Sequence, residues 1–206
     1  MPSPGWPTEL VAGGVLLRPV RLRDAGRWRD LRSVNAEWLR QWEATPPEGT
    51  PRDGGVAVYT GHISDLRRMA RVGLALPWVV CWKGQFVGQM IVSNIVRGSL
   101  NAGSAGYWIS ADHAGRGIIP VALAMAVDHS VKAVGLHRIE VNIRPENRQS
   151  RRVAEKLGLR EEGVRRRYLH IAGGYRDHVA FAVDAEDLAG QGLLARYVSR
   201  GGLVPS

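Results

Sequence analysis

Two glycines, Gly115 and Gly117, stand between an apolar run and a long stretch of helix-forming residues. Pro120 follows closely, and proline is favoured in the first turn of a helix, where its missing N–H would have no partner. Such a turn leaves several backbone N–H groups pointing at one place, at the positive end of a helix dipole. Groups arranged in this way bind phosphate. The loop therefore predicts a phosphate site, and the question is which phosphate.

The composition is that of a globular chain with no sign of export. The 206 residues include 45% hydrophobic side chains, enough for a sizeable core. No run approaches the roughly 18 apolar residues of a membrane span, and no signal-peptide pattern is present, so we expect a cytoplasmic protein. The single cysteine, Cys81, lies in an apolar run, which favours a buried strand residue over a nucleophile. The six histidines have no metal-ligand spacing, so no metal site is predicted.

The net charge of +9 favours anionic partners, such as a nucleotide-bearing cofactor, an acidic peptide or RNA. The interleaved aromatic and basic residues of RNA-binding modules are missing from the sequence. No Walker lysine follows the glycines, which disfavours nucleotide hydrolysis. A Rossmann domain is also disfavoured, because no glycine fingerprint follows a first strand.

Hydrophobic periodicity predicts alternating strands and helices. Strands are expected at 15–20, 78–82, 86–95, 105–110, 138–143, 160–171 and 175–183. Helices are expected at 25–34 with Asp24 as its cap, at 36–42, 58–71 and 121–134, and between Asn147 and Gly158; the Pro- and Gly-rich segment 44–55 is expected to be a loop. This order predicts an α/β fold with a mixed, largely antiparallel sheet. We expect one domain over residues 1–206, with a core at about 15–185 and a tail, 190–206, that either packs as a short helix or frays.

The segment Asn147–Leu159, together with the glycine loop, resembles the GNAT N-acetyltransferases. That family carries (Gln/Arg)-x-x-Gly-x-(Gly/Ala) between a strand and a helix, and later Asn-x-x-(Ser/Ala) followed by Glu-Lys-Leu-Gly-Phe. The resemblance is closest to the RimJ/RimL branch, which acetylates N-terminal amines of ribosomal proteins. It covers residues 15 to 185, and the segments that carry it are 38–43, 93–99, 106–109 and 175–178.

The sequence departs from the family motif at two positions of the loop. Ala114 stands where Gln or Arg is usual, and Ile119 where Gly or Ala is usual. Both changes are tolerable, because backbone N–H groups hold a pyrophosphate and any residue except proline supplies one. Arg116 could replace the lost side-chain contact by pairing with a phosphate.

The resemblance implies that acetyl-CoA lies in a gap between the strand at 107–110 and the next strand, 138–143. It implies a backbone N–H near Ile109 that binds the thioester carbonyl. Asn147 is expected to cap its helix and, by the resemblance, to contact the cofactor. The cofactor-binding residues expected are Tyr107, Trp108, Ile109, Ser110, Ala114, Gly115, Arg116, Gly117, Ile118, Ile119, Asn147 and Ser150.

Glu43, Tyr168 and Ser150 are the candidates for catalysis, and Glu140 is considered beside them. A carboxylate acting through water, or a well-placed carbonyl, could serve as the base. Glu43 is one candidate, although a solvated loop acid is the simpler interpretation of this residue. Glu140 either reaches the site or faces solvent. Tyr168 is the candidate acid for the departing thiolate, with a packed strand tyrosine as the alternative. Ser150 either joins the site or bonds to backbone in the first helical turn.

The resemblance implies transfer of acetyl from acetyl-CoA to the N-terminal amine, on Ala or Ser, of a ribosomal protein. The amine attacks directly in a ternary complex. Two alternatives stay open: a small-molecule acetyltransferase for polyamines or antibiotics, and a noncatalytic CoA-binding or ribosome-associated module. The sequence does not distinguish a monomer from a homodimer.

Overall fold

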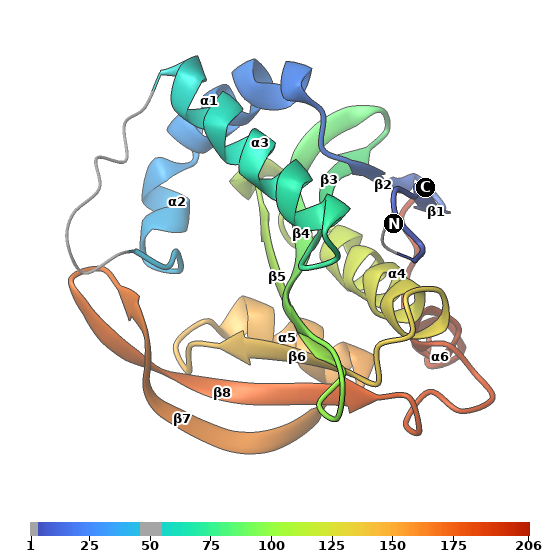
Figure 1. The fold of residues 1–206 in the computed structure, drawn as a ribbon. Coiled ribbons are helices and arrows are strands. Elements are labelled where there is room, and N and C mark those ends of the chain that lie inside the picture. Colours follow the sequence, from blue (N-terminus) through green and yellow to red (C-terminus); the bar gives the residue numbers. More distant parts are fainter. Residues whose placement is uncertain (1–3, 46–54) are drawn as a thin grey trace.

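A computed structural model describes residues 4–45 and 55–206, and it is built around one eight-stranded sheet (Figure 1). The strand order is β1-β2-β3-β4-β5-β6-β8-β7. The strands are β1 Leu10–Ala12, β2 Val15–Pro19, β3 Leu76–Trp82, β4 Gln85–Val96, β5 Ala102–Ile109, β6 Arg138–Ile143, β7 Arg160–Ile171 and β8 Gly174–Asp184. Every neighbouring pair is antiparallel except β5 and β6. The predicted mixed, largely antiparallel sheet is confirmed.

Helices cover both faces of the sheet (Figure 1). On one side lie α1 Ala25–Val34, α2 Ala36–Arg40 and α3 Val56–Arg71; on the other lie α4 Ile118–Lys132, α5 Arg148–Leu157 and α6 Leu193–Ser199. Strand β3 is buried on both faces, since Trp78 and Val80 pack toward α4 while Val79 and Cys81 pack toward α1 and α3. None of the helices in the described ranges has both the length and the apolar character needed to cross a bilayer.

Cys81 is a buried strand residue, as the apolar run predicts. Burial raises the pKa of its thiol, with the nearby Arg18 guanidinium acting in the opposite direction. A buried thiol with a raised pKa is a poor nucleophile. The structure therefore gives this cysteine a packing role.

The pairing of β5 with β6 stops after three residues. Residues 102–104 of β5 pair with residues 138–140 of β6, and beyond them both strands continue without pairing to each other. The two strand ends diverge, which leaves a gap at the centre of the sheet that no neighbouring strand fills. This is the splayed strand pair that the resemblance implies, and it positions the site described below.

The first helix begins where the sequence predicts but without the predicted cap. Asp24 occupies the N-cap position of α1, yet its side chain makes no capping hydrogen bond there. Its carboxylate accepts two hydrogen bonds at 2.8 Å from Arg18 and one at 2.8 Å from the backbone N–H of Arg21. A half-buried guanidinium is a stronger donor than a helix N–H, so the ion pair takes the carboxylate.

Several other boundaries differ from those expected from the sequence. Strand β1 has only three residues, too few for a periodic signal. Helix α4 begins at Ile118 and not at 121, because Gly117 takes a left-handed conformation and starts the helix earlier, with Pro120 still in its first turn. The expected loop at 44–55 falls largely on residues 46–54, which lie outside the described part of the chain.

The C-terminal segment packs as a helix and does not fray. The backbone N–H groups of Leu193 and Leu194 donate to the Asp128 carboxylate of α4, at 2.6 and 3.1 Å. Leu193 and Tyr197 are buried in the main core. Because the carboxylate satisfies N–H groups at the start of α6, it fixes that helix against α4.

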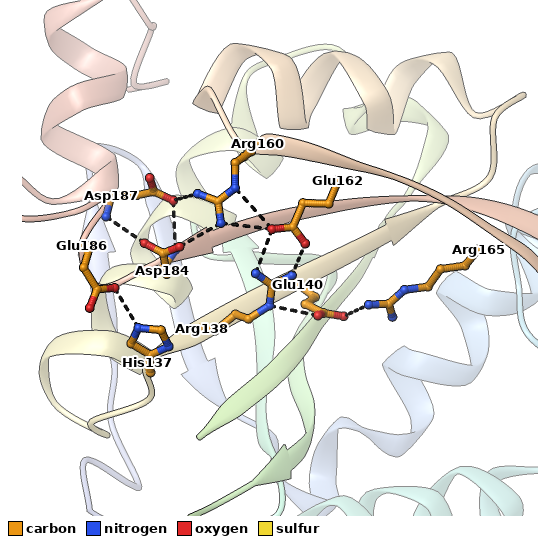
Figure 2. Close-up of polar contacts among 9 residues, drawn as sticks. All are labelled: His137, Arg138, Glu140, Arg160, Glu162, Arg165, Asp184, Glu186 and Asp187. Carbon is orange, nitrogen blue, oxygen red and sulfur yellow. Dashed lines mark hydrogen bonds and ion pairs between the residues drawn. The ribbon is translucent and has the colours of Figure 1, made fainter. Parts of the chain in front are cut away.

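Figure 2 shows a network of ion pairs that ties β6, β7 and β8 together. At one end, Glu140 accepts hydrogen bonds from Arg138 at 3.0 Å and from Arg165 at 2.6 Å. At the other end, Arg160 pairs with Asp184 at 2.8 Å and with Asp187 at 2.7 Å. Glu140 is thereby held among arginines of the sheet, and it lines neither cavity of the site described below.

Glu162 sits at the centre of this network, and we expect it to give stability a measurable acid dependence. Hydrogen bonds from Arg138 hold the pKa of its carboxyl at about 2, below the ordinary value of 4.5. A carboxyl with a lowered folded-state pKa stabilises the fold above the unfolded pKa and loses that contribution as pH falls from about 4.5 to 2. Glu162→Gln should therefore flatten the loss of stability in that window, and cost about 1 kcal/mol or less at neutral pH.

Urea unfolding at a series of pH values measures this effect. Glu155→Gln, which changes an exposed acid of α5 away from the network, is the matched control and should keep the wild-type slope. An unchanged acid slope in Glu162→Gln would mean that the network does not lower the pKa of this carboxyl.

Candidate active site

The glycine loop has the backbone conformation that an anion site requires. Gly115 and Gly117 both have positive φ, at +77° and +79°, and Gly117 is the N-cap of α4. Within the described residues, the backbone N–H groups of 115–119 make no hydrogen bond. The side chains of Ile118 and Ile119 are buried, so these residues offer their backbone and not their side chains. The loop thus presents several free donors at a helix N-terminus, as predicted.

The other two loop residues are placed differently. The backbone N–H of Ala114 donates to the Ala111 carbonyl at 3.1 Å and is not free. Arg116 donates from Nε to the Asp112 carbonyl at 3.1 Å, and its guanidinium carbon lies 5.3 Å from the centre of the Trp82 ring. These contacts hold a cation beside the loop, where it can approach a phosphate. Trp82 was not found from the sequence, because its run reads only as a buried strand.

The edge of β5 that faces the gap carries a backbone donor. Ser110 donates its N–H to the Val87 carbonyl of β4 at 2.9 Å. Successive N–H groups of a strand point to opposite edges, so the N–H of Ile109 points into the gap. The Ile109 carbonyl accepts a hydrogen bond at 3.1 Å from Trp38 Nε1 of α2. Ser110 itself is occupied within the fold, since its hydroxyl bonds to His113 Nδ1 at 2.7 Å.

A small cavity of about 170 Å³ lies at the gap. Its lining includes six residues singled out from the sequence, namely Glu43, Tyr107, Trp108, Ile109, Asn147 and Ser150. A larger cleft adjoins it between α1, α3 and the strands, and Glu43, Tyr107 and Trp108 line both. The structure therefore places Glu43 where the cleft meets the gap.

Arg32 of α1 organises this junction and was missed from the sequence. It donates to the Glu43 carboxylate, and its guanidinium carbon lies 5.4 Å from the centre of the Trp108 ring. The Trp108 ring is fixed from the other side, because its Nε1 donates to buried Gln89 at 3.0 Å. The sequence does not distinguish Arg32 from the other arginines, because its contact with Trp108 joins residues far apart in the chain.

The N-terminus of α5 forms the opposite wall of the small cavity. Asn147 accepts a hydrogen bond at 3.0 Å from the backbone N–H of Ser150, which confirms the predicted cap. The Tyr107 hydroxyl is buried in this region, where it makes no hydrogen bond of normal geometry to the described residues and has the Ser150 hydroxyl as its polar neighbour. Burial raises the pKa of Tyr107 to about 12, and Ser150 acts in the opposite direction.

Tyr168 does not join this cluster. It is 37% exposed on β7, its hydroxyl accepts a hydrogen bond from Arg165 at 3.3 Å, and its ring lies edge-on to His178. The neighbouring Asp177 accepts from the backbone N–H of Arg167 at 2.8 Å and serves the β7–β8 hairpin.

The glycine loop and the gap between β5 and β6 can be compared with the parts of acetyl-CoA that they would bind. The loop offers free N–H groups for a pyrophosphate, and the unpaired edges of β5 and β6 leave room for an extended arm. Among the described residues, the buried Tyr107 hydroxyl at the gap makes no hydrogen bond of normal geometry. Buried polar groups without such a bond are uncommon, and a polar ligand in the gap would satisfy this hydroxyl. The residues fit the cofactor.

A splayed sheet with a glycine loop at its central helix defines a GNAT-type acetyltransferase. The sequence matches the family described as acetyltransferase (GNAT) domain over residues 15–160, and the chain belongs to this family. It is an acetyl-CoA-dependent N-acetyltransferase.

Three relatives extend the comparison over most of the chain. RimJ of Mycobacterium smegmatis, solved in complex with CoA-disulfide, has a TM-score of 0.92 and 40% identity, over 98% of this chain and 99% of that chain. The [ribosomal protein uS5]-alanine N-acetyltransferase of Escherichia coli (strain K12) is 31% identical over 182 residues, 87% of this chain and 92% of that protein. The ribosomal-protein-S5-alanine acetyltransferase of Vibrio fischeri has a TM-score of 0.79 and 26% identity, over 87% and 98% of the two chains.

Proposed function

We propose that this enzyme acetylates the N-terminal α-amine, on Ala or Ser, of a ribosomal protein in the cytoplasm. The observation that carries the proposal is the junction at Glu43, where an open cleft meets the small cavity at the β5–β6 gap. A free chain end can enter such a cleft and bring its amine to the gap. The relatives named for ribosomal-protein alanine acetylation support the same acceptor.

Most of the site residues bind acetyl-CoA. The free N–H groups of 115–119 hold the pyrophosphate, and Arg116 adds a cation beside it. The N–H of Ile109 is the donor for the thioester carbonyl. Asn147 and Ser150 close the other side of the cavity. When bound, acetyl-CoA supplies the acetyl group as a thioester.

Glu43 is the base of the proposed reaction. A free N-terminus has a pKa near 8, so a minority is already neutral at physiological pH and the demand on a base is mild. Glu43 can take the amine proton directly or through a water molecule. Its hydrogen bond from Arg32 fixes the carboxylate at the junction. The nitrogen–carbon bond forms as the carbon–sulfur bond breaks, and one proton leaves the amine.

A panel of amines tests the acceptor. The purified enzyme is incubated with acetyl-CoA and with peptides beginning in Ala or Ser, polyamines or aminoglycosides, and release of free thiol is followed. We expect turnover with the peptides, and the net charge of +9 disfavours cationic drugs. Turnover with drugs or polyamines alone would favour a small-molecule enzyme, and tight CoA binding without any turnover would favour a noncatalytic module.

A further inference from the structure

Arg144 joins the two sides of the site. It follows β6 directly, in the turn that leads into α5, and its backbone carbonyl accepts a hydrogen bond at 2.9 Å from the N–H of Asn147, the N-cap of that helix. Its side chain reaches the other side, where it donates at 2.7 Å to the carbonyl of Gln41, just after α2. The guanidinium carbon also lies 5.6 Å from the centre of the Trp42 ring. The backbone of Arg144 thus belongs to the α5 wall of the small cavity, and its side chain contacts the segment that carries Glu43.

The guanidinium of Arg144 is largely shielded from solvent. Its side chain is 15% exposed, and the carboxylate of Glu146 lies 3.2 Å from its Nε. Its charge also reaches His178 of β8: burial, together with this charge, lowers the pKa of His178, so this imidazole is neutral at physiological pH. A cation that has lost water contacts is attracted more strongly to an aromatic ring and to a carbonyl oxygen. Arg144 therefore holds the residues that follow α2 firmly.

Segment 41–45 is fixed by three separate elements. Its last residue docks on the β7–β8 hairpin, since the N–H of Thr45 donates at 2.8 Å to the carbonyl of His170. Figure 1 shows the end of α2 beside the tip of this hairpin. At the centre of the segment, Glu43 accepts a hydrogen bond from Arg32 of α1. The contact from the β6–α5 turn holds the first two residues, and of these three contacts it is the one that comes from the α5 wall.

We propose that Arg144 is a positioning residue for the base, because it ties Glu43 to the α5 wall of the cavity. This inference rests on the proposed acetyl transfer, in which that wall binds CoA and Glu43 takes the proton. Trp42 and Glu43 are neighbours that both line the small cavity, so a shift of the Trp42 backbone moves the carboxylate relative to the thioester. Arg144 lines neither cavity, and it acts through the segment and not on the reacting atoms.

The first test needs neither an acceptor nor turnover. Amide hydrogen exchange in residues 38–45 is measured by mass spectrometry for the wild-type enzyme and for Arg144→Met, both with CoA bound. Methionine keeps much of the side-chain length but loses the cation and its donors. Because exchange reports local opening, we expect it to be about 10-fold faster in this segment of the variant.

The matched control is an arginine that makes the same kind of contact elsewhere. Arg97, in the turn between β4 and β5, donates at 3.1 Å to the carbonyl of Val134, which is also distant in the chain. Arg97→Met should leave both the exchange of residues 38–45 and kcat at the wild-type values. A general effect of losing one arginine would appear in this variant as well.

Kinetics then distinguish positioning of the base from simple packing. Arg144→Met should lower kcat on a peptide beginning with Ala by about 10-fold, because a small misplacement of a catalytic group is costly. The Kd of CoA should change little, and the deficit should shrink as pH rises past the amine pKa of about 8. Arg144→Lys keeps a cation and a donor and should recover part of the loss. Combined with Glu43→Gln, Arg144→Met should add no more than about a twofold loss, because residues that act through one another are not additive.

The outcomes separate this inference from the proposed function. Unchanged exchange in residues 38–45 of Arg144→Met would overturn it, as would a loss of kcat that is the same at every pH or that multiplies with the loss in Glu43→Gln. If no peptide is acetylated but exchange still rises, the acceptor assignment fails and the tie between Arg144 and the segment stands. If wild type and Arg144→Met acetylate peptides equally well, the function stands and the role of Arg144 is refuted. Thermal unfolding establishes that each variant is folded, and Arg144→Lys provides the same comparisons if Arg144→Met does not fold.

Discussion

Gly117→Pro is expected to weaken CoA binding by at least about 100-fold, because charge-assisted hydrogen bonds to a phosphate contribute roughly 1.5–3 kcal/mol each. Proline fixes φ near −65° and has no N–H, whereas Gly117 has φ of +79° and begins α4 with free donors around it. The substitution removes one donor and turns its neighbours away. Titration calorimetry with CoA measures the loss.

Two further variants make this result specific. Gly98→Pro is the matched control, because Gly98 also has φ of +79° and stands in open space at the turn between β4 and β5. It should keep wild-type affinity for CoA. Gly117→Ala keeps the N–H but strains the backbone by roughly 1–2 kcal/mol, so we expect an intermediate loss. Unchanged CoA affinity in Gly117→Pro would contradict the assignment of this loop to the pyrophosphate.

Glu43→Gln is expected to lower kcat on a peptide acceptor by about 100-fold at pH 7, toward the low end for loss of a general base. The deficit should shrink as pH rises past the amine pKa of about 8, because the acceptor is then already deprotonated. The KM for acetyl-CoA should change little, since the pyrophosphate is held elsewhere. The measurement is a pH–rate profile of the variant and the wild type.

The control for Glu43 is an acid of the neighbouring helix. Glu37→Gln changes an exposed carboxylate of α2 that pairs with Arg40, and it should leave the profile unchanged. A loss in Glu43→Gln that is the same at every pH would contradict the role of base. It would indicate that Glu43 acts by holding Arg32 in place.

The features that the sequence predicts well are those set by neighbouring residues. The glycine loop follows from two glycines and a proline within six positions, and the cap of α5 follows from Asn147 and Ser150 three residues apart. Each structure is determined by backbone groups within one or two turns. For this reason the loop conformation and the cap were predicted without knowledge of the fold.

The features that were missed depend on contacts between distant segments. The gap arises because β5 and β6 stop pairing after residue 104, which no periodicity reveals, and the resemblance alone implied it. Arg32 of α1 contacts the Trp108 ring, and Trp38 of α2, which the sequence marks only within the segment 38–43, donates to Ile109. Each contact joins residues about 70 positions apart in the chain. Side chains of this kind acquire a role only once the helices are packed.

Tyr107 and Tyr168 show why the sequence alone does not predict which face of the sheet a strand side chain occupies. Both are strand tyrosines, and the face that a strand residue occupies is reversed by a one-residue change in register. The register of β7 against β8 shifts between Arg165 and Leu169, so the direction of Tyr168 cannot be counted from the strand ends. Tyr107 lies in an unshifted part of the β4–β5 ladder and points to the α5 side.

The central claim is that acetyl passes from acetyl-CoA bound at the gap to the α-amine of a protein N-terminus. The most direct measurement is tandem mass spectrometry of a peptide that begins with Ala and also contains an internal lysine, after incubation with the enzyme and acetyl-CoA. We predict one added acetyl group, located on the α-amine, and none on the same peptide with a blocked N-terminus. Acetyl on the lysine with the α-amine unmodified would contradict the account.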